Sequence, residues 1–458
     1  MKNILLVTLI LLFETSFTQT FDVETIVQSG SNESRINLVI LSDGYQINEL
    51  PQFITDATAF SNYFFSRSPY KEYKNYFNVH AVKVPSNQSG ANHPGTASDV
   101  SEPVHPVLSV DNYFGSRFDA YGIHRLLVAN SSTINTVLAN NFPSYDLVLV
   151  LVNSSYYGGS GGQFAVSSTN ANANKIALHE IGHAFVRLID EYYAGDVYAR
   201  EGINMTQTTN PLTVRWKNWI GQNNIGIYQH CCGGNSASWY RPHQNCMMRY
   251  LNAPFCSVCI EATIEKIHAI TSPIISYVPL NTGSIDIASG MDFTVTLIEP
   301  IPNSLDVEWK LNGTVINNGN STVTISSNDL AVGNNSLQVT IIDATSYLQV
   351  DNHENIHVNS ILWNINSSTL SIDDILKNSL NIELIPNPTQ NILSVKLTNK
   401  ENYLLEISDI SGKQLITKNV TQHVTPIQVD LNKLSSGTYI VKFNFKNGLI
   451  ITRKIIKN

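Results

Sequence analysis

Apolar runs separated by short polar stretches set the pattern of the N-terminal half of the chain. Residues 36–41 are mostly apolar and end in a Ser-Asp-Gly-Tyr turn signal, which predicts a buried strand. Residues 76–84 alternate between apolar and polar and predict a second strand, while the apolar residues 146–152 predict a central strand covered on both faces. Helical spacing of apolar side chains over residues 51–65 predicts a helix. Mixed strands and helices indicate an α/β or α+β domain.

The stretches around these elements carry weaker periodicity. Residues 20–35 are predicted to form an N-terminal arm, and residues 200–230 irregular structure anchored by Trp216 and Trp219. A helix over residues 260–268 is expected to close this domain near residue 272.

The pattern changes to short alternating runs after residue 275. Turn signals such as Asn-Gly separate these runs, and this spacing over residues 275–360 predicts a small immunoglobulin-like β-sandwich. A Ser/Asn-rich linker follows over 361–381, and residues 382–458 are again strand-like. The expected architecture is therefore an α/β domain followed by two small β-sandwich domains.

Composition and the first residues add a cellular context. The 458 residues are enough for about three domains. The net charge is −8 and no basic block occurs, which argues against nucleic acid as a partner. A basic start and an apolar run over residues 4–13 are typical of a secretory signal peptide, here 1–18. That run is half the roughly 20 residues that a membrane-spanning helix needs, and no later segment qualifies.

The chemistry of the chain centres on the sequence His-Glu-x-x-His in a predicted helix over residues 173–189. His179 and His183 lie about 40° apart on one helix face, so both imidazoles can hold one metal ion. We expect them to bind one catalytic Zn²⁺ ion and Glu180 to act as general base on a water that the zinc activates. The alternative is two ordinary histidines packed on a helix.

The sequence offers three candidates for the third zinc ligand. Asp190 is our first candidate, with Glu191 and His243 as alternatives. Seven helical residues would carry Asp190 about 10 Å from His183, so the helix must break after Leu188 for this carboxylate to reach the metal. The metzincin pattern places its ligand one residue earlier, where this chain has isoleucine. Asp190 and Glu191 otherwise serve as supporting or ion-pairing residues on this loop.

A glycine-rich stretch follows the predicted central strand. We expect it to form an edge strand or loop beside the cleft, where an extended substrate adds as a further strand. A flexible surface loop is the alternative. The predicted substrate-binding residues are Gly158, Gly159, Ser160 and Gly161.

Two further residues are candidates for the floor and the rim of the site. Met248 follows a bend and is predicted to lie beneath the metal, as the methionine of a Met-turn does; an ordinary core methionine is the alternative. Tyr250 is a candidate donor to the oxyanion, because a tyrosine at the same offset has this role in astacin-type enzymes.

All five cysteines lie between residues 231 and 259, and their pairing is open. We expect disulfides that staple a loop-rich segment, because a second C-x-x-C pair of proper spacing is missing for a metal knuckle. Asp43, Asp111 and Asp119 are candidate ligands of a structural Ca²⁺ ion, although capping of surface loops explains these residues more simply.

The order of several motifs over residues 36–270 resembles the IgA-peptidase family of secreted zinc metallopeptidases. The resemblance implies a metzincin-like metallopeptidase domain over residues 19–272, with an upper α/β part and a more irregular lower part. The family is named for cleavage of an immunoglobulin hinge. The motifs are Asn37-Leu38-Val39-Ile40-Leu41-Ser42-Asp43-Gly44-Tyr45, Ser89-Gly90-Ala91, Val152-Asn153 with Tyr157-Gly158-Gly159-Ser160-Gly161-Gly162, His179-Glu180-x-Gly182-His183 with Leu188-x-Asp190-Glu191-Tyr192, and Tyr240-Arg241-Pro242 before Met248-Arg249.

The last block resembles the C-terminal sorting domain of type IX secretion substrates. This resemblance implies export through the periplasm of a Gram-negative bacterium, interaction with the type IX machinery, and a domain that is removed or anchors the protein at the surface. A second adhesive β-sandwich is the alternative. The motifs are Pro386-Asn387-Pro388, Ile410-Ser411-Gly412-Lys413, Ser436-Gly437-Thr438-Tyr439-Ile440-Val441 and Arg453-Lys454-Ile455-Ile456-Lys457.

Together these features predict a secreted zinc endopeptidase that hydrolyses peptide bonds of extracellular proteins or glycoproteins. The alternative is a catalytically inactive surface protein that binds glycans or proteins through its sandwich.

Overall fold

The computed structural model describes most of the chain, which divides into two compact units. The first holds the N-terminal part and most of residues 290–364, and the second holds residues 365–458 with two short stretches. The predicted signal peptide, Cys232 and most of the predicted linker lie outside the described residues. The described residues are 20–101, 103–231, 233–287, 290–351, 353, 357–367, 382–397, 402–421, 426–446 and 448–458.

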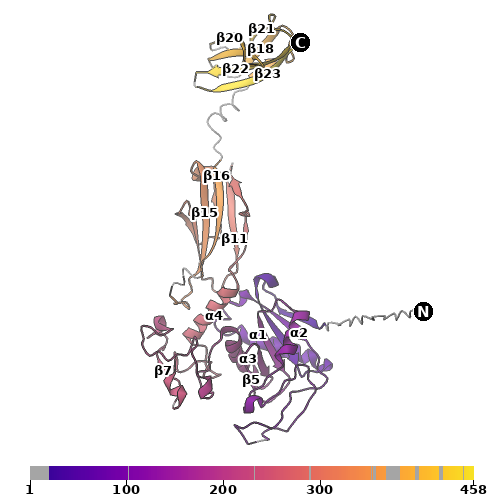
Figure 1. Cartoon of the computed structure of the whole chain (residues 1–458), viewed down its shortest axis with the longest axis vertical. Coiled ribbons are helices and arrows are strands. Elements are labelled where there is room, and N and C mark those ends of the chain that lie inside the picture. The colour runs from indigo at the N-terminus through magenta and orange to yellow at the C-terminus, as the bar shows by residue number, and fades with distance from the viewer. Residues whose placement is uncertain are drawn as a thin grey trace, which may run out of the picture. The chain divides into compact units, whose positions relative to one another are not determined.

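A six-stranded mixed sheet forms the centre of the N-terminal part, beside the helices labelled α1, α2 and α3 in Figure 1. Its strand order is β1-β3-β2-β4-β6-β5. β2, β3, β4 and β6 are parallel, while β1 and β5 run antiparallel at the two edges. The three predicted strands are confirmed as β2, β3 and β4. The predicted arm is partly wrong, because it contains the edge strand β1. The strands are β1 (Asp22–Val27), β2 (Ile36–Asp43), β3 (Phe77–Lys83), β4 (Leu147–Val152), β5 (Gly159–Ser160) and β6 (Ala165–Ser168).

Helices cover both faces of this sheet, as the wholly buried β2 and β4 require. α1 (Leu50–Phe64) and α3 (Ala173–Ile181) pack on the face that carries the even-numbered residues of β2. α2 (Ser131–Asn141) packs on the opposite face. The helix predicted at 51–65 is confirmed as α1, and the architecture is a three-layer α/β arrangement.

The segment between α3 and the last helix, α4 (Ser257–Ile270), is irregular, as predicted. Its regular pieces are one short hairpin of β7 (Tyr228–Gln229) with β8 (Tyr240–Arg241) and several single turns. Trp216 and Trp219 are both buried and confirmed as anchors. The 3-10 turns of the described chain are η1 (Asn32–Ser34), η2 (Ile47–Glu49), η3 (Lys74–Tyr76), η4 (Ala120–Gly122), η6 (Asp196–Tyr198), η7 (Lys217–Trp219), η8 (Asn235–Ser238) and η9 (Ser327–Asp329).

Two sheets with the orders β10-β16-β15-β12-β13 and β14-β11-β9 form the predicted middle sandwich. Trp309 and Trp363 stack in its core with ring centroids 5.7 Å apart. The last strand runs to Ser367, so the sandwich extends into the region predicted as linker. The strands are β9 (Ile274–Val278), β10 (Ser284–Asp286), β11 (Met291–Leu297), β12 (Leu305–Leu311), β13 (Thr314–Asn318), β14 (Thr322–Ile325), β15 (Gly333–Asp343) and β16 (Asn359–Ser367).

The C-terminal block also contains two antiparallel sheets, with the orders β17-β18-β21 and β20-β19-β22-β23. Residues of both sheets share one apolar core, so this region is β-rich, as expected. Within the described residues, no helix combines the length and apolarity needed to cross a membrane. The strands are β17 (Ile382–Ile385), β18 (Ile392–Leu397), β19 (Tyr403–Asp409), β20 (Gln414–Val420), β21 (Ile427–Asp430), β22 (Gly437–Phe445) and β23 (Ile450–Lys457).

A buried carboxylate joins the middle sandwich to the α/β part within the first unit. Asp343 at the end of β15 accepts hydrogen bonds from Tyr73 at 2.5 Å and from Ser304 at 2.7 Å, and its carboxylate lies 2.8 Å from His268 Nε2 on α4. Tyr76 donates to the carbonyl of Ile298 at 2.8 Å. Burial alone raises the pKa of Asp343, but the bonds from His268, Tyr73 and Ser304 outweigh it, so this pKa lies below its ordinary value.

We expect Asp343→Asn to lower the free energy of unfolding at neutral pH by roughly 3 kcal/mol, because it breaks a buried charged network. A pKa that is depressed in the folded state stabilises the protein above the unfolded pKa, and this stabilisation is lost as the pH falls through the folded value. As the pH is lowered from 7 to 3, the melting temperature should therefore fall more steeply for wild type than for the Asp343→Asn variant. Asp306→Asn, at an exposed position of the same sandwich, is the control. If the melting temperatures of Asp343→Asn and wild type changed with pH in the same way, the role of this network would be contradicted.

Candidate metal centre

The His-Glu-x-x-His motif lies where α3 passes from α-helical to π-helical geometry. α3 ends at Ile181 and continues as one π-helical turn, η5 (Gly182–Val186). Arg187 then adopts a left-handed backbone with φ of 66°, which reverses the chain. The predicted helix through residue 189 is thus too long, and the break comes one residue before the expected point after Leu188. This reversal turns the following loop back toward the histidines.

Three donor atoms converge beside this reversal. The Nε2 atoms of His179 and His183 lie 3.0 and 3.1 Å from Asp190 Oδ1, and 3.2 Å from each other. Donors bound at 2.0–2.1 Å to a tetrahedral zinc ion are about 3.3 Å apart. The observed separations therefore fit a divalent metal ion with little adjustment.

The protonation of the histidines also favours a cation at this point. His179 Nδ1 lies 3.1 Å from the carbonyl of Met247, and His183 Nδ1 lies 2.6 Å from the carbonyl of Leu188. A carbonyl only accepts hydrogen bonds, so each Nδ1 carries a proton and each Nε2 presents a lone pair. Two lone pairs and a carboxylate oxygen within 3.2 Å repel one another unless a proton or a metal ion lies between them. Burial lowers the pKa of His183, but Asp190 outweighs this and raises it to about 9, which again marks a place that favours positive charge.

The two alternative third ligands lie elsewhere. Glu191 is fully buried and points away from the histidines, with Asn204 Nδ2 donating to its Oε1 at 2.9 Å. His243 accepts a hydrogen bond from the amide of Asn245 at 3.0 Å and is not among the residues that line the cleft. Of the three candidates, only Asp190 is brought to the histidines.

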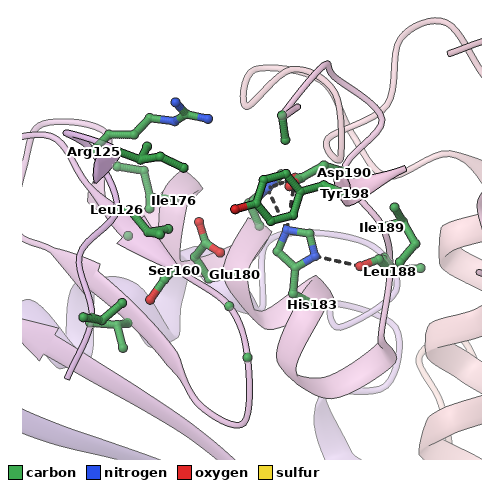
Figure 2. Close-up of a pocket in the computed structure, with 18 of the residues that line it drawn as sticks. Arg125, Leu126, Ser160, Ile176, Glu180, His183, Leu188, Ile189, Asp190 and Tyr198 are labelled. Atoms are coloured by element: carbon green, nitrogen blue, oxygen red, sulfur yellow. Dashed lines mark hydrogen bonds and ion pairs between the residues drawn. The ribbon is translucent and has the colours of Figure 1, made fainter. Parts of the chain in front are cut away.

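A cleft of about 990 Å³ opens in front of these residues. Glu180 lines it together with both histidines and Asp190, and its carboxylate points into the space above β5 (Figure 2). Burial raises the pKa of the Glu180 carboxyl above its ordinary value, whereas His179 and His183 act in the opposite direction. A carboxylate with a raised pKa is better suited to take up a proton near neutral pH.

The predicted Tyr250 is not one of the tyrosines that line the cleft, which are Tyr121, Tyr157, Tyr192, Tyr193 and Tyr198. Tyr250 is half exposed under the guanidinium of Arg249 and is not among the cleft-lining residues, so the structure does not bring it to the site. Tyr192 lines the cleft, with its ring centroid 6.2 Å from that of His179. Arg125, from the opposite side of the cleft, donates to the Tyr192 hydroxyl at 3.3 Å. The sequence did not indicate that Arg125 belongs to the site, because this residue lies in a long loop with no recognisable pattern.

The glycine-rich stretch packs directly against the metal-binding helix. A Cβ on Gly159 would lie 2.5 Å from Ile176 Cγ2, and a Cβ on Gly161 would lie 2.5 Å from His183 Cβ. Glycine is therefore required here for close approach, as predicted. Gly159, Ser160 and Gly161 line the cleft, whereas Gly158 packs behind it against Phe118.

The predicted pairing of substrate with this edge needs a correction at Gly159. Its amide donates to the carbonyl of Arg125 at 3.2 Å, and its carbonyl accepts from the amide of Leu127 at 3.3 Å. At Gly159, backbone hydrogen bonds to the 125–127 segment therefore occupy the outer edge of β5. An extended peptide cannot add to the strand there.

We expect Gly161→Ala to lower hydrolysis roughly 10²-fold, because the new methyl group pushes on His183 and displaces a ligand. Gly162→Ala is the matched control, since a Cβ on Gly162 has no neighbour within 4 Å. Cleavage rates and metal content of both variants should be measured side by side. Equal activity of the two variants would show that the loop yields without disturbing His183.

Met248 lies buried under the start of the π turn, where a Cβ on Gly182 would be 3.0 Å from its Sδ atom. Its carbonyl accepts a hydrogen bond from the amide of Glu191 at 2.8 Å. The methionine thus lies beneath the residues that carry the ligands, where a Met-turn methionine is expected. Its own loop also holds the carbonyl of Met247 that orients His179.

The expectation of disulfides is wrong for three of the five cysteines. Cys246, Cys256 and Cys259 are reduced and buried, with Sγ separations of 3.6 Å between Cys256 and Cys259 and 3.7 Å between Cys246 and Cys259. These distances are well above the roughly 2.05 Å of a disulfide bond.

The structure also argues against calcium at Asp43. Its carboxylate is fully buried rather than on the surface, and it accepts hydrogen bonds from the amides of Phe114 at 2.9 Å and Ser116 at 3.2 Å. Asp43 therefore holds the 112–116 loop against β2. Asp119 lies with His93 and His124 in a group of possible metal ligands, and Asp111 is exposed.

Comparison with known proteins identifies two parts of the chain. Residues 24–226 match the family described as IgA Peptidase M64, and residues 383–458 match the secretion system C-terminal sorting domain. A search of curated proteins found no match. Both resemblances expected from the motifs are thereby confirmed.

Solved structures show only faint similarity. An immunoglobulin-like β-sandwich protein from Bacteroides vulgatus is 13% identical over 17% of this chain and 94% of that chain, with a TM-score of 0.15. Dimeric latent PorU from Porphyromonas gingivalis is 14% identical over 40% of this chain and 20% of that chain, with a TM-score of 0.15. Scores this low do not establish a shared fold. The family matches do identify the parts: the chain carries a peptidase domain of the IgA peptidase M64 family over residues 24–226 and a type IX secretion sorting domain over residues 383–458.

Proposed function

We propose that this chain is a secreted zinc-dependent endopeptidase that hydrolyses peptide bonds of extracellular proteins or glycoproteins. The observation that carries the proposal is the convergence of His179, His183 and Asp190 on one point, with Glu180 beside them in an open cleft. This arrangement combines a place for a divalent cation with a carboxylate of raised pKa, which are the parts needed for metal-assisted hydrolysis. The M64 family match supports the same reading.

A bound zinc ion would supply Lewis acidity, which activates a water molecule and polarises a scissile carbonyl. His179 and His183 hold their lone pairs toward that ion because the carbonyls of Met247 and Leu188 fix their Nδ1 protons. Glu180 takes a proton from the attacking water and delivers it to the leaving amine.

We assign the orientation of the substrate carbonyl to Tyr192 and Arg125 rather than to Tyr250. Both line the cleft, and their side chains are joined by a hydrogen bond across it. A hydroxyl held by a guanidinium has its proton free to donate toward a developing negative charge.

The test is digestion of casein and of a panel of extracellular glycoproteins with and without a zinc chelator. We expect cleavage inside the chains, its loss on chelation and its return when zinc is restored. Failure to cleave any protein in a chelator-sensitive way would favour the alternative of an inactive binding protein.

We also propose that residues 1–18 are removed on export and that the sorting domain directs passage through the type IX machinery. The family match at residues 383–458 indicates export to the surface or the medium. Mass spectrometry of the exported protein gives the mature termini. A chain that still ends at Asn458 would contradict removal of the sorting domain.

A further inference from the structure

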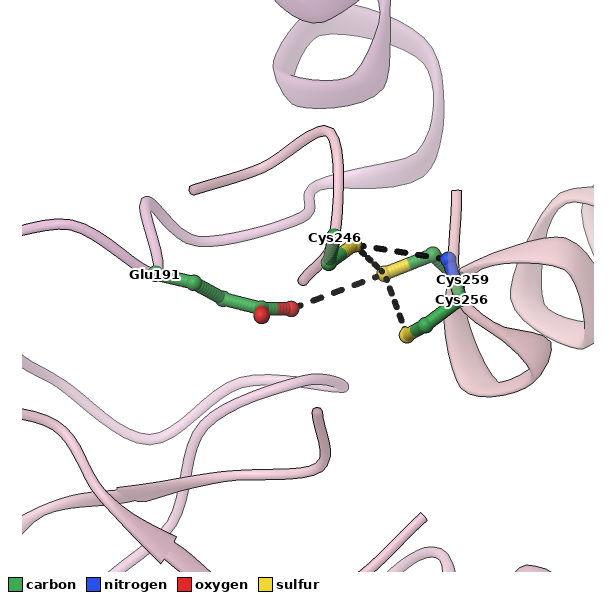
Figure 3. A group of neighbouring side chains, drawn as sticks. All are labelled: Glu191, Cys246, Cys256 and Cys259. Atoms are coloured by element: carbon green, nitrogen blue, oxygen red, sulfur yellow. Dashed lines mark hydrogen bonds between the residues drawn. The ribbon is translucent and has the colours of Figure 1, made fainter. Parts of the chain in front are cut away.

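A second group of potential metal ligands lies behind the candidate metal centre. It consists of Glu191 from the loop after α3, Cys246 from the Met248 loop, and Cys256 and Cys259 from the start of α4 (Figure 3). One ligand atom of each residue lies within 4.8 Å of all the others. All four residues are buried. We call this group the cysteine cluster.

We propose that the cysteine cluster binds a structural zinc ion through three thiolates and one carboxylate. Thiolates bound at about 2.3 Å to a tetrahedral zinc ion are separated by about 3.8 Å. Cys259 Sγ lies 3.7 Å from Cys246 Sγ, 3.6 Å from Cys256 Sγ and 3.8 Å from Glu191 Oε1. These three separations match the edges of a zinc tetrahedron, and the other ligand atoms lie within 4.8 Å of one another.

The buried carboxylate gives an independent reason for a cation. Glu191 is 0% exposed, and its Oε2 atom has no hydrogen-bond partner among the described residues. The other oxygen, Oε1, accepts a hydrogen bond from Asn204 at 2.9 Å and lies 3.8 Å from Cys259 Sγ. A buried carboxylate oxygen without a partner is unfavourable unless a proton or a cation compensates it. A metal ion among the sulfur atoms would be that partner.

The start of α4 favours a thiolate at Cys256. Cys256 is the N-cap residue of α4, so the positive end of the helix dipole lies next to the sulfur atoms. The amide of Cys256 donates to Cys246 Sγ at 3.4 Å. Soft thiolate ligands in a closed, buried tetrahedron select zinc over calcium, magnesium or manganese.

A disulfide between any two of the three cysteines explains less. It would need to shorten a sulfur separation by about 1.6 Å, and it would leave the third thiol and the Glu191 carboxylate buried together. The zinc site uses all four groups at once.

The cluster would also hold the candidate metal centre in place. Glu191 directly follows Asp190, and its amide donates to the carbonyl of Met248 at 2.8 Å. Cys246 immediately precedes Met247, whose carbonyl orients His179. A structural zinc ion would therefore fix both loops that shape the first site. This consequence rests on the proposed function, whereas the second site itself does not.

The test counts zinc in the full-length chain by native mass spectrometry and elemental analysis. We expect two tightly bound ions in wild type and one in His183→Ala, which leaves the cysteine cluster intact. Cobalt loaded into His183→Ala should produce the strong near-ultraviolet absorption of thiolate-to-cobalt charge transfer. His183→Ala with no bound metal, or cobalt without thiolate absorption, would overturn the proposal.

A second measurement determines the oxidation state and the metal protection of the three cysteines. Alkylation followed by peptide mapping should find Cys246, Cys256 and Cys259 as reduced thiols that zinc protects and that react once the metal is removed. A disulfide joining two of them in the exported protein would refute the site. Cys259→Ser should keep no more than one zinc ion, and Glu191→Gln, the milder variant, should release the second ion at least tenfold faster than wild type. Neither result depends on peptidase activity, so failure of the proposed function is distinguishable from failure of this site.

Discussion

Glu180→Gln is expected to lower peptide hydrolysis by about 10³-fold while leaving the metal content unchanged. Glutamine keeps the shape of the side chain but cannot take a proton from water, and Glu180 is not one of the three converging donors. Initial rates on a cleaved protein substrate and zinc per chain should be measured in the same preparation. An unchanged zinc content with lost turnover is the signature of a general base rather than of a ligand.

Glu201→Gln is the matched control for this experiment. Glu201 lies on the surface in an ion pair with Arg215, outside the cleft, so the same chemical change there should leave the rate as in wild type. Wild-type turnover by Glu180→Gln would refute the mechanism, and loss of zinc would move Glu180 into the ligand set.

Asp190→Asn should weaken metal binding roughly 10²- to 10³-fold, because one of three protein ligands and the only negative charge among them is lost. Hydrolysis should fall with metal occupancy and recover in part at high zinc concentration. Competition against a chelator of known affinity gives the change in dissociation constant.

His243→Ala is the control that separates the two alternatives weighed from the sequence. Because His243 lies outside the cleft, this variant should bind zinc as tightly as wild type. Full retention of tightly bound zinc by Asp190→Asn would show that another group completes the site. Loss of zinc in His243→Ala would mean that the loop around residue 243 moves to the metal.

The helix part of the site could be predicted because it depends on local geometry alone. Residues four apart on a helix share a face whatever surrounds them, so His179 and His183 needed no tertiary information. Asp190 depends on the reversal at Arg187, a left-handed residue that is not glycine. The reversal is a local helix end, in which the amide of Leu188 donates to the carbonyl of Gly182 at 3.1 Å. Glycine usually holds the left-handed position of such an end, so an arginine there gives no sequence signal.

The cysteines show where a sequence pattern misled the prediction. The C-x-x-C pair by itself does not predict a metal site, because a second such pair of proper spacing is missing from the sequence. In the structure the remaining positions are filled by Cys246 and by Glu191, a carboxylate 55 residues before Cys246 in the chain (246 − 191). Neither spacing nor residue type links this glutamate to the cysteines before the fold is known.

Edge strands were also harder to predict from the sequence than central strands. Asp22–Val27 shows no strict alternation of polar and apolar residues, and its pairing partner β3 begins more than fifty residues after the start of β1. Central strands such as β4 were recognised from their unbroken apolar run, because burial on both faces leaves a direct mark on the sequence. An edge strand leaves a fainter one, and β1 was therefore assigned to an arm.

Helix α4 has a consequence for how this protein could have been assembled in evolution. Its first turn carries Cys256 and Cys259, and about 15 Å further along His268 contacts Asp343 of the sandwich. A peptidase domain separated after residue 272 would leave His268, Tyr73 and Tyr76 without the acceptors they contact in β15 and beside β11. The α/β part and the middle sandwich are therefore expected to be inherited together as one unit. Relatives that lack this sandwich should carry other residues at these three positions, whereas the sorting domain can be exchanged without touching them.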